Sequence, residues 1–187
     1  GAHHWNQKQV LYEEPSRVPL IVYDPRCPNN GKVDRSHLVS TGLDLLPTFC
    51  DYAGVRVPAD KQGFSLRPLL APSQTETEWR RYLTVETEFG IHSHPFGIAG
   101  RALYSQQYKY IVYSEGTKRE QFFDLIKDPG ETVNLITDPS FGTIINDHRQ
   151  ALRAWMQETY DTFELPSRAI DDQSKPDGPA GARAEQL

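Results

Sequence analysis

Four segments rich in aromatic and β-branched residues follow one another in the second half of the chain, and they constrain the fold more than any other feature. They cover residues 82–86, 99–104, 108–114 and 121–125. Such residues favour strands, and Glu115-Gly116-Thr117-Lys118 is typical of a hairpin turn between the last two. From Phe141 to Phe163 apolar residues recur at helical spacing. The pattern predicts a small antiparallel sheet with an amphipathic helix laid across it.

The first 73 residues show a different pattern, a strand followed by a helix. The apolar run from Val18 to Tyr23 suits a strand buried on both faces of a mainly parallel sheet. In the helix that follows, we expect Ser40 or Thr41 at the start, Gly54 at the end, and a kink or restart at Pro47. The predicted fold class is α/β: the end of a large mixed sheet, plus a small antiparallel subdomain with a C-terminal helix.

These patterns predict a division of the chain into three parts. Residues 1–73 are expected to form the end of a large α/β domain, and residues 74–165 the sheet and helix subdomain. Residues 166–187 lack apolar periodicity and are expected to form a flexible tail. The chain has no initiator Met and begins directly at a cluster of His and Lys before the apolar run, so we expect it to be part of a longer protein.

Composition narrows the classes of partner. The net charge is −5, with basic residues scattered among 25 acidic ones, which argues against binding to nucleic acid. The longest apolar run is far shorter than the roughly 20 residues needed to cross a bilayer, so we expect no membrane span. Cys27 and Cys50 have neither the spacing of a zinc pair nor the density of a disulfide scaffold. The two cysteines therefore do not indicate whether the protein works in an oxidising or a reducing compartment.

Lys8 is the first candidate for chemistry. It lies beside His3 and His4 on a loop that leads into the predicted parallel strand. Ligand sites in such sheets form at strand ends, and an ammonium group suits a tetrahedral oxyanion. The alternative is a solvated lysine on a loop, the usual state of lysine.

Five short motifs along the chain resemble type I sulfatases, in the family's order and from Gly1 to about Phe163. The motifs are G-x-H-x-W-x-x-K-x-x-L-Y-E-E-x-x-R-V-P-L-I-V at residues 1–22, L-V-S-x-x-x-D-L-L-P-T with A-G at 38–54, G-F-S-L with L-L at 63–70, R with Y-K-Y-I at 101–111, and F-D-L with D-P-G-E and N-L at 123–135.

The resemblance implies the C-terminal part of an alkaline-phosphatase-like sulfatase fold. It further implies hydrolysis of a sulfate ester or sulfamate, expected to be that of a sulfated carbohydrate, by a formylglycine nucleophile with bound Ca²⁺. Lys8 matches the family lysine that contacts the sulfate group, where it would stabilise charge in the transition state. His3 matches a histidine common in the family and is the second candidate catalytic residue.

The family's nucleophile motif, C-x-P-x-R or C-x-A-x-R, does not occur at Cys27 or Cys50. No metal ligand can be assigned within the chain, so the calcium ligands are expected upstream of it. The chain alone is therefore expected to be inactive and to need the N-terminal part of the catalytic domain as its partner. A periplasmic, secreted or lysosomal location is what the resemblance implies.

His92, His94 and Arg101 are candidate substrate-binding residues because they lie in or beside a Gly-flanked loop between two predicted strands, where they could face a sugar or an anionic group. A surface or packing role is equally favoured for each. For Glu13, Glu14 and Arg17 an ion pair that fixes the loop to the core is favoured over substrate contact. The run 128–131 has the composition of a turn rather than a metal loop.

Two other functions stay open. One is a phosphodiesterase or phosphonate monoester hydrolase of the same superfamily, which can share the segment that carries Lys8. The other is a non-catalytic module that binds a ligand without turning it over.

Overall fold

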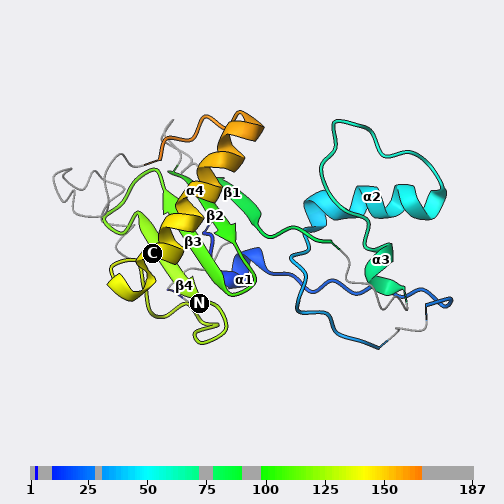
Figure 1. Ribbon diagram of the computed structural model, residues 1–187, viewed down its shortest axis with the longest axis horizontal. Helices are drawn as coiled ribbons and strands as arrows, with labels where there is room; N and C mark the ends of the chain where they lie inside the picture. Colours follow the sequence, from blue (N-terminus) through cyan, green and yellow to red (C-terminus); the bar gives the residue numbers. More distant parts are fainter. Residues whose placement is uncertain (1–2, 4–9, 28–30, 72–77, 90–97, 166–187) are drawn as a thin grey trace. The chain divides into compact units, whose positions relative to one another are not determined.

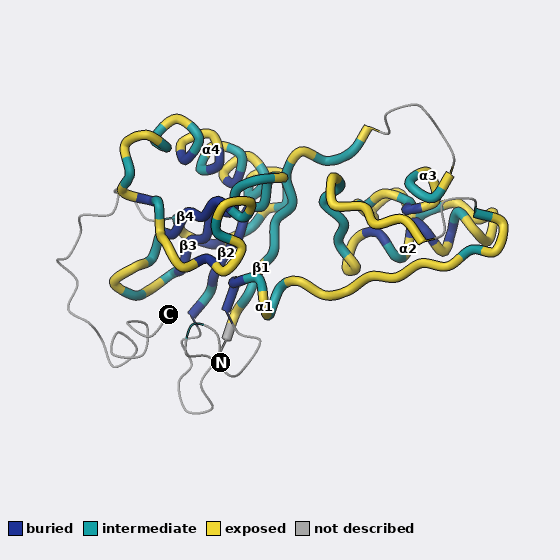
Figure 2. The backbone as a smooth tube through the Cα atoms, turned by 90° about the horizontal axis from the view of Figure 1, so that it is seen from below, coloured by how far each residue is buried: buried dark blue, intermediate teal, exposed yellow. Residues whose placement is uncertain are grey.

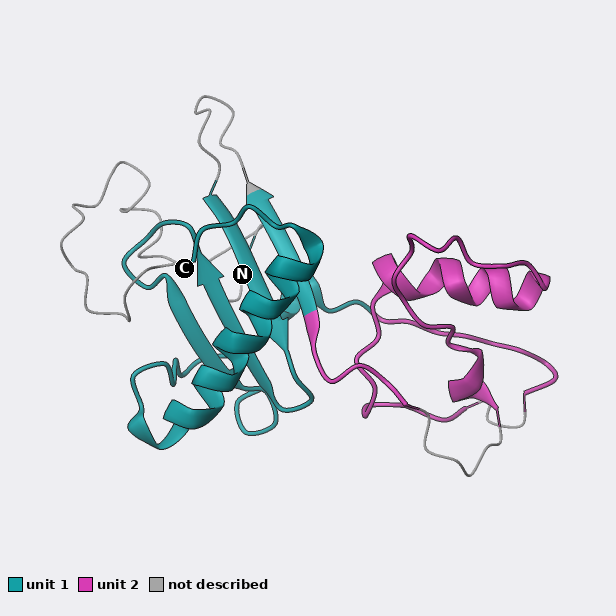
Figure 3. Ribbon diagram, turned by 45° about the horizontal axis from the view of Figure 1, so that its top comes forward, with its two compact units in different colours: residues 1–18, 84–187 teal, residues 19–83 magenta. Residues whose placement is uncertain are grey.

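The contacts in the chain form two compact units. The computed structural model describes residues 3, 10–27, 31–71, 78–89 and 98–165. One unit combines residues 1–18 with residues 84–187, and the other is residues 19–83 (Figure 3). The contacts thus divide the chain at residues 18 and 83, whereas the boundary predicted at residue 73 stays a prediction. The predicted flexible tail, residues 166–187, lies outside the described residues.

The first unit is built on a four-stranded sheet, with the strands in sequence order (Figure 1). The strands are β1 (Leu83–Phe89), β2 (Ile98–Tyr104), β3 (Tyr108–Tyr113) and β4 (Glu120–Asp124). β2 pairs antiparallel with β3, and β3 pairs antiparallel with β4. In the register, Ala102 lies opposite Ile111, and Ile111 lies opposite Gln121. The predicted antiparallel sheet and the hairpin turn between β3 and β4 are confirmed.

A long helix, α4 (Gly142–Thr159), follows a single 3-10 turn, η2 (Pro139–Phe141), and lies across the sheet (Figure 1). Its buried His148 contacts the Ser105 hydroxyl at 3.0 Å from Nε2. This confirms the predicted helix and its packing role. The helix ends earlier than the predicted range of 141–163, because Tyr160 is a left-handed C-cap residue with φ of 56°, and its side chain is 91% exposed.

The N-terminal segment belongs to the core of this unit. Val10, Leu11 and Tyr12 are each at most 3% exposed. They pack against residues from three strands, among them Ala102, Ile111 and Phe123. A short helix, α1 (Glu13–Ser16), follows directly. Figure 2 shows this buried stretch beside the buried strands, and its burial explains why residues 1–18 group with the sheet.

The second unit contains α2 (Thr41–Ala53) and the short α3 (Arg67–Leu70). As predicted, α2 begins after Ser40 and ends at Gly54, which is left-handed with φ of 68°. It continues through Pro47 as one helix and does not restart there. None of the helices in the described part of the chain combines the length and apolar character needed to cross a membrane.

The strand predicted from Val18 to Tyr23 does not form in this structure. These residues have no strand structure and are largely exposed (Figure 2), with Ile21 89% and Tyr23 76% accessible. A strand buried on both faces of a parallel sheet needs neighbouring strands to pair with, and the sheet of described strands contains β1 to β4 only. The predicted end of a large mixed sheet is therefore absent from the described residues.

Candidate functional site

Two backbone amides of the N-terminal segment donate hydrogen bonds to side chains of β3 and of the turn after β4. The Leu11 amide donates to the Tyr113 hydroxyl at 3.0 Å, and the Glu13 amide donates to Oε2 of Glu131 at 2.6 Å. The fit is close at Gly100 on β2, where an added Cβ would lie 2.7 Å from the Tyr113 ring and 2.9 Å from the Leu11 side chain. Only glycine leaves room for this approach.

A buried ionic cluster lies where the segment meets the sheet. Lys109 of β3 has a fully buried side chain, and its Nζ lies 3.0 Å from Oε1 of Glu13 and 2.5 Å from Oε1 of Glu131. The same Nζ donates to the Tyr104 hydroxyl at 3.2 Å and lies 4.9 Å from the centre of the Tyr104 ring. One buried cation thus joins the N-terminal segment, β2 and the turn after β4.

The turn after β4 supplies the second carboxylate of this cluster. Glu131 has φ of 52°, a conformation that residues other than glycine seldom adopt. Burial raises the pKa of Glu131, while the charge and hydrogen bond of Lys109 oppose the rise. Burial likewise raises the pKa of the Tyr104 hydroxyl, and the nearby Glu13 adds to that shift. The turn predicted at residues 128–131 is confirmed, but its buried acid was not expected.

His3 packs on the same segment. Its ring stacks on Tyr12, with centroids 3.8 Å apart and an angle of 6° between the rings. One ligand atom each from His3, Glu14 and Glu131 lie within 4.8 Å of one another. Calcium prefers six to eight oxygen ligands, whereas this group offers a ring nitrogen and a carboxylate already paired with the Lys109 ammonium. The group does not fit a calcium site.

Arg101 of β2 lies in a separate network. Its guanidinium donates to both oxygens of Asp161 at 2.7 and 2.8 Å, lies 3.4 Å from a Glu86 oxygen, and stands over the Phe163 ring at 4.8 Å. The hydrogen bond from Arg101 holds the pKa of Asp161 below its usual range. These contacts tie the chain after α4 to the sheet. The substrate-binding role of Arg101 stays a prediction.

Of the predicted site residues, the structure describes only His3 and Arg101. Lys8, His92 and His94 lie outside the described residues, and His3 and Arg101 lie in different networks. The predicted ion pair between the loop and the core is confirmed for Glu13.

Sequence reasoning missed Lys109 and Glu131 as members of one site. The sequence did contain an indication. Lys109 lies within the apolar run 108–113, and a lysine in a buried strand needs an acidic partner.

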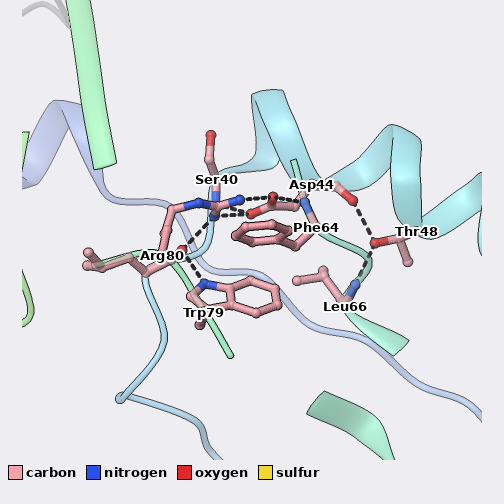
Figure 4. Close-up of polar contacts among 8 residues, drawn as sticks. Ser40, Asp44, Thr48, Phe64, Leu66, Trp79 and Arg80 are labelled. Atoms are coloured by element: carbon pink, nitrogen blue, oxygen red, sulfur yellow. Dashed lines mark hydrogen bonds and ion pairs between the residues drawn. The ribbon is translucent and has the colours of Figure 1, made fainter. Parts of the chain in front are cut away.

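A second polar network, in the other unit, is structural. The Asp44 carboxylate of α2 is fully buried and accepts hydrogen bonds from the Ser40 amide at 2.8 Å, the Phe64 amide at 2.9 Å, and two nitrogens of Arg80 (Figure 4). The Thr48 hydroxyl donates to the Asp44 carbonyl and accepts from the Leu66 amide at 2.9 Å. Both oxygens of Asp44 are engaged, so this acid fastens the 63–66 loop to α2.

Known proteins match this chain over most of its length. Residues 1–158 match the family model for N-sulphoglucosamine sulphohydrolase, C-terminal. A Delta 4,5-hexuronate-2-O-sulfatase of Bacteroides thetaiotaomicron is 36% identical over 87% of this chain and 33% of its own length.

Two solved structures of relatives resemble the chain in fold. The structure of a 2-O GAG sulfatase is 31% identical, with a TM-score of 0.67 over 85% of this chain and 35% of that one. A structure in complex with its substrate D-glucosamine-2-N,6-O-disulfate is 25% identical, with a TM-score of 0.51 over 62% of this chain and 24% of that one. The chain thus spans about a third of the length of the hexuronate-2-O-sulfatase and of the 2-O GAG sulfatase, and about a quarter of the third relative.

Proposed function

The chain belongs to the alkaline-phosphatase-like sulfatase family, whose C-terminal region it matches, and from this premise we propose that it is part of an enzyme that hydrolyses sulfate esters or sulfamates of a sulfated carbohydrate. The observation that carries the proposal is the relative named for a 2-O-sulfated hexuronate, which matches 87% of this chain at 36% identity. The relative whose structure holds D-glucosamine-2-N,6-O-disulfate as its substrate supports the same class of substrate.

In this proposal Lys8 contacts the sulfate group. As the S–O or S–N bond breaks, negative charge grows on the sulfate oxygens and on the leaving atom, and a fixed ammonium group lowers the energy of that charge distribution. The burial of the residues that follow supports this role. The core holds the backbone of Val10, Leu11 and Tyr12, and this fixed stretch begins two positions after Lys8. His3, stacked on Tyr12, is proposed as a second catalytic residue.

The nucleophile and the metal ion are proposed to come from the part of the protein before this chain. A formylglycine would supply the attacking oxygen, and calcium would supply charge that holds the sulfate. Neither Cys27 nor Cys50 begins the nucleophile motif, and the described group of His3, Glu14 and Glu131 does not fit calcium. The 187-residue chain alone is therefore proposed to be inactive.

The exposed run from Val18 to Tyr23 supports a partner in the rest of the catalytic domain. An apolar segment of this length is rarely left in water, because it offers an unpaired edge for association. We propose that it pairs with strands of the part of the protein that the relatives have and this chain lacks.

His92, His94 and Arg101 are proposed to face the sugar.

The test is sulfate release by the full-length protein that contains this chain. The substrates are a 2-O-sulfated unsaturated hexuronate disaccharide, glucosamine with N-sulfate or 6-O-sulfate, and matched phosphate and phosphonate esters. We expect release from at least one sulfated sugar, and a loss of about 100-fold or more in kcat for Lys8→Ala, as for other groups that stabilise developing charge.

Other results would redirect the proposal. Faster hydrolysis of phosphate or phosphonate esters would favour a phosphodiesterase or phosphonate monoester hydrolase. Saturable binding of a sulfated sugar without turnover would favour a non-catalytic module.

A further inference from the structure

We infer that the outward face of α2 docks on the apolar face of a β-sheet in the part of the protein that this chain lacks; the existence of that part rests on the proposed function. The inference starts from the large side chains that α2 exposes. They recur at every third position along one side of the helix and are all apolar or aromatic. These four residues, which we call the outward face, are between 36% and 64% exposed: Leu43, Leu46, Phe49 and Tyr52.

The charged side chains of α2 lie on its other side and are bound within the unit. The structure describes every residue of α2, and Asp44 and Asp51 are its two charged residues. Asp44 is fully buried and bound to the 63–66 loop (Figure 4), and Asp51 accepts from the Ser65 hydroxyl at 2.7 Å and from Arg67 at 2.8 Å. A helix on a protein surface normally turns its charges to water and its apolar side chains inward. α2 does the reverse, so its outward face has the composition of a surface that another surface covers.

The same unit exposes a second apolar surface, in the run that precedes α2. In the part of this run that belongs to the unit, Leu20 to Tyr23, the exposed fraction reaches 89% at Ile21 (Figure 2). The chain directly after the run is tied to α2, because the Tyr52 hydroxyl donates to Oδ2 of Asp24 at 3.1 Å. One unit therefore carries a run with the composition of a strand and, later in the chain, a helix with an apolar outward face.

This order of elements favours a sheet as the partner. In α/β folds a strand joins the sheet, and the helix that follows it packs back on a face of that sheet. The run has the composition of such a strand and α2 the apolar face of such a helix, but the sheet of described strands, β1 to β4, does not include the run. The hexuronate-2-O-sulfatase matches this chain over only 33% of its own length, so it has ample further chain for a sheet.

The first experiment places a charge on the outward face in the full-length protein. Phe49→Glu is compared with Ile126→Glu after β4, because the two side chains are 64% and 68% exposed. If Phe49 stays in water, the change is harmless, since glutamate is the better helix former. If Phe49 is docked, the change buries an unpaired charge. We then expect hydrogen exchange of the α2 amides to become at least about tenfold faster in Phe49→Glu, and exchange of β4 to stay within about twofold in Ile126→Glu.

The second experiment identifies what covers the face. The photoreactive residue p-benzoylphenylalanine replaces Phe49 in the full-length protein, with the same replacement at Ile126 as control. We expect position 49 to crosslink to a peptide from outside the 187 residues of this chain, within one copy of the protein, and position 126 to give no such crosslink. The captured peptide should be rich in β-branched residues, as buried parallel strands are.

Several results would overturn the inference. These are α2 exchange that is unchanged or slower in Phe49→Glu, and a crosslink from position 49 that joins two copies, stays within this chain or does not form. A captured peptide with helical spacing of its apolar residues would overturn the sheet as the partner. If Phe49→Glu does not fold, the crosslink decides, because p-benzoylphenylalanine keeps the aromatic ring. If the wild-type protein releases no sulfate, the proposed activity fails, and the crosslink still decides whether α2 is docked.

Discussion

Arg80 binds Asp44 with two parallel hydrogen bonds, Nη1 to Oδ2 at 2.7 Å and Nη2 to Oδ1 at 2.5 Å. Asp44 is fully buried and also accepts from the Ser40 and Phe64 amides, so a single carboxylate connects the start of α2, the 63–66 loop and residue 80. Burial alone would raise the pKa of Asp44, but the hydrogen bonds from Arg80 and the two amides hold it below its usual value.

Replacing Asp44 with Asn should therefore strongly destabilise the unit of residues 19–83. The change leaves a guanidinium that is about nine-tenths buried without its countercharge, which costs about 3–5 kcal/mol when a buried pair is broken. The measurement is the opening free energy of α2 by native-state hydrogen exchange in the full-length protein. Arg67→Ala is the control, because its pair with Asp51 is half exposed and should be worth about 1 kcal/mol or less. Equal losses for both variants would contradict the prediction.

Gly63 contributes to the same unit through its backbone conformation and its lack of a side chain. It has φ of 131°, and an added Cβ would lie 2.1 Å from the Leu43 carbonyl oxygen, on the helix turn where Pro47 has no N–H to donate. Gly63→Ala should lower the opening free energy of α2 by about 2 kcal/mol or more, from backbone strain and the collision together. Gly42→Ala, on α2 with no close neighbour, should be neutral or stabilising by up to about 1 kcal/mol. The prediction fails if the two alanines have the same effect.

Tyr113 supplies the acceptor for a buried amide of the N-terminal segment. Tyr113→Phe keeps the ring but leaves the Leu11 N–H without its partner, which costs about 1–3 kcal/mol for a buried donor. The loss should be seen as faster hydrogen exchange at Leu11, while α4 exchanges as before. Tyr110→Phe is the matched control, since the Tyr110 hydroxyl bonds Glu120, which also pairs with Arg149 of α4 on the other face of the sheet. If Leu11 exchanges at the same rate in both variants, the hydroxyl does not hold the segment.

Local patterns predicted most of the elements. The strands from residue 82 to residue 125 and the helices at 41–53 and 142–159 follow from β-propensity, helical spacing and end residues such as Ser40 and Gly54, all of which act over a few positions. The run from Val18 to Tyr23 shows the limit of such reasoning. Its composition predicts a buried strand, but strand formation depends on neighbours that the run itself does not encode.

The candidate site was harder to predict, because it joins residues that are far apart in the chain. Glu13 and Lys109 are separated by 96 positions, and Glu13 and Glu131 by 118. The sequence shows that Lys109 lies in a strand that should be buried, and hence that it needs an acid. It does not show which of the 25 acidic residues that is. The partner is chosen by the turn after β4, where Glu131 takes a rare backbone conformation that composition does not predict.

Asp161 and Arg101 should make the stability of the sheet unit depend on pH in acid. The hydrogen bond from Arg101 lowers the pKa of Asp161 in the folded protein below its unfolded value of about 3.9. The folded state thus binds this proton less readily, so the pair stabilises fully above about pH 4 and its contribution is lost as the pH falls through the folded pKa. Asp161→Asn should be less stable than wild type at pH 7, and the difference should shrink below pH 4.

Urea unfolding of the full-length protein at pH 7, 4 and 3 measures this difference, with Asp147→Asn on the exposed side of α4 as control. The other carboxylates of the protein titrate in the wild type and in the variant alike. Only the difference in stability between the two therefore reports on Asp161. A difference that stays constant from pH 7 to pH 3 would mean that the contact with Arg101 holds the chain after α4 by its hydrogen bonds and not by the charge of Asp161.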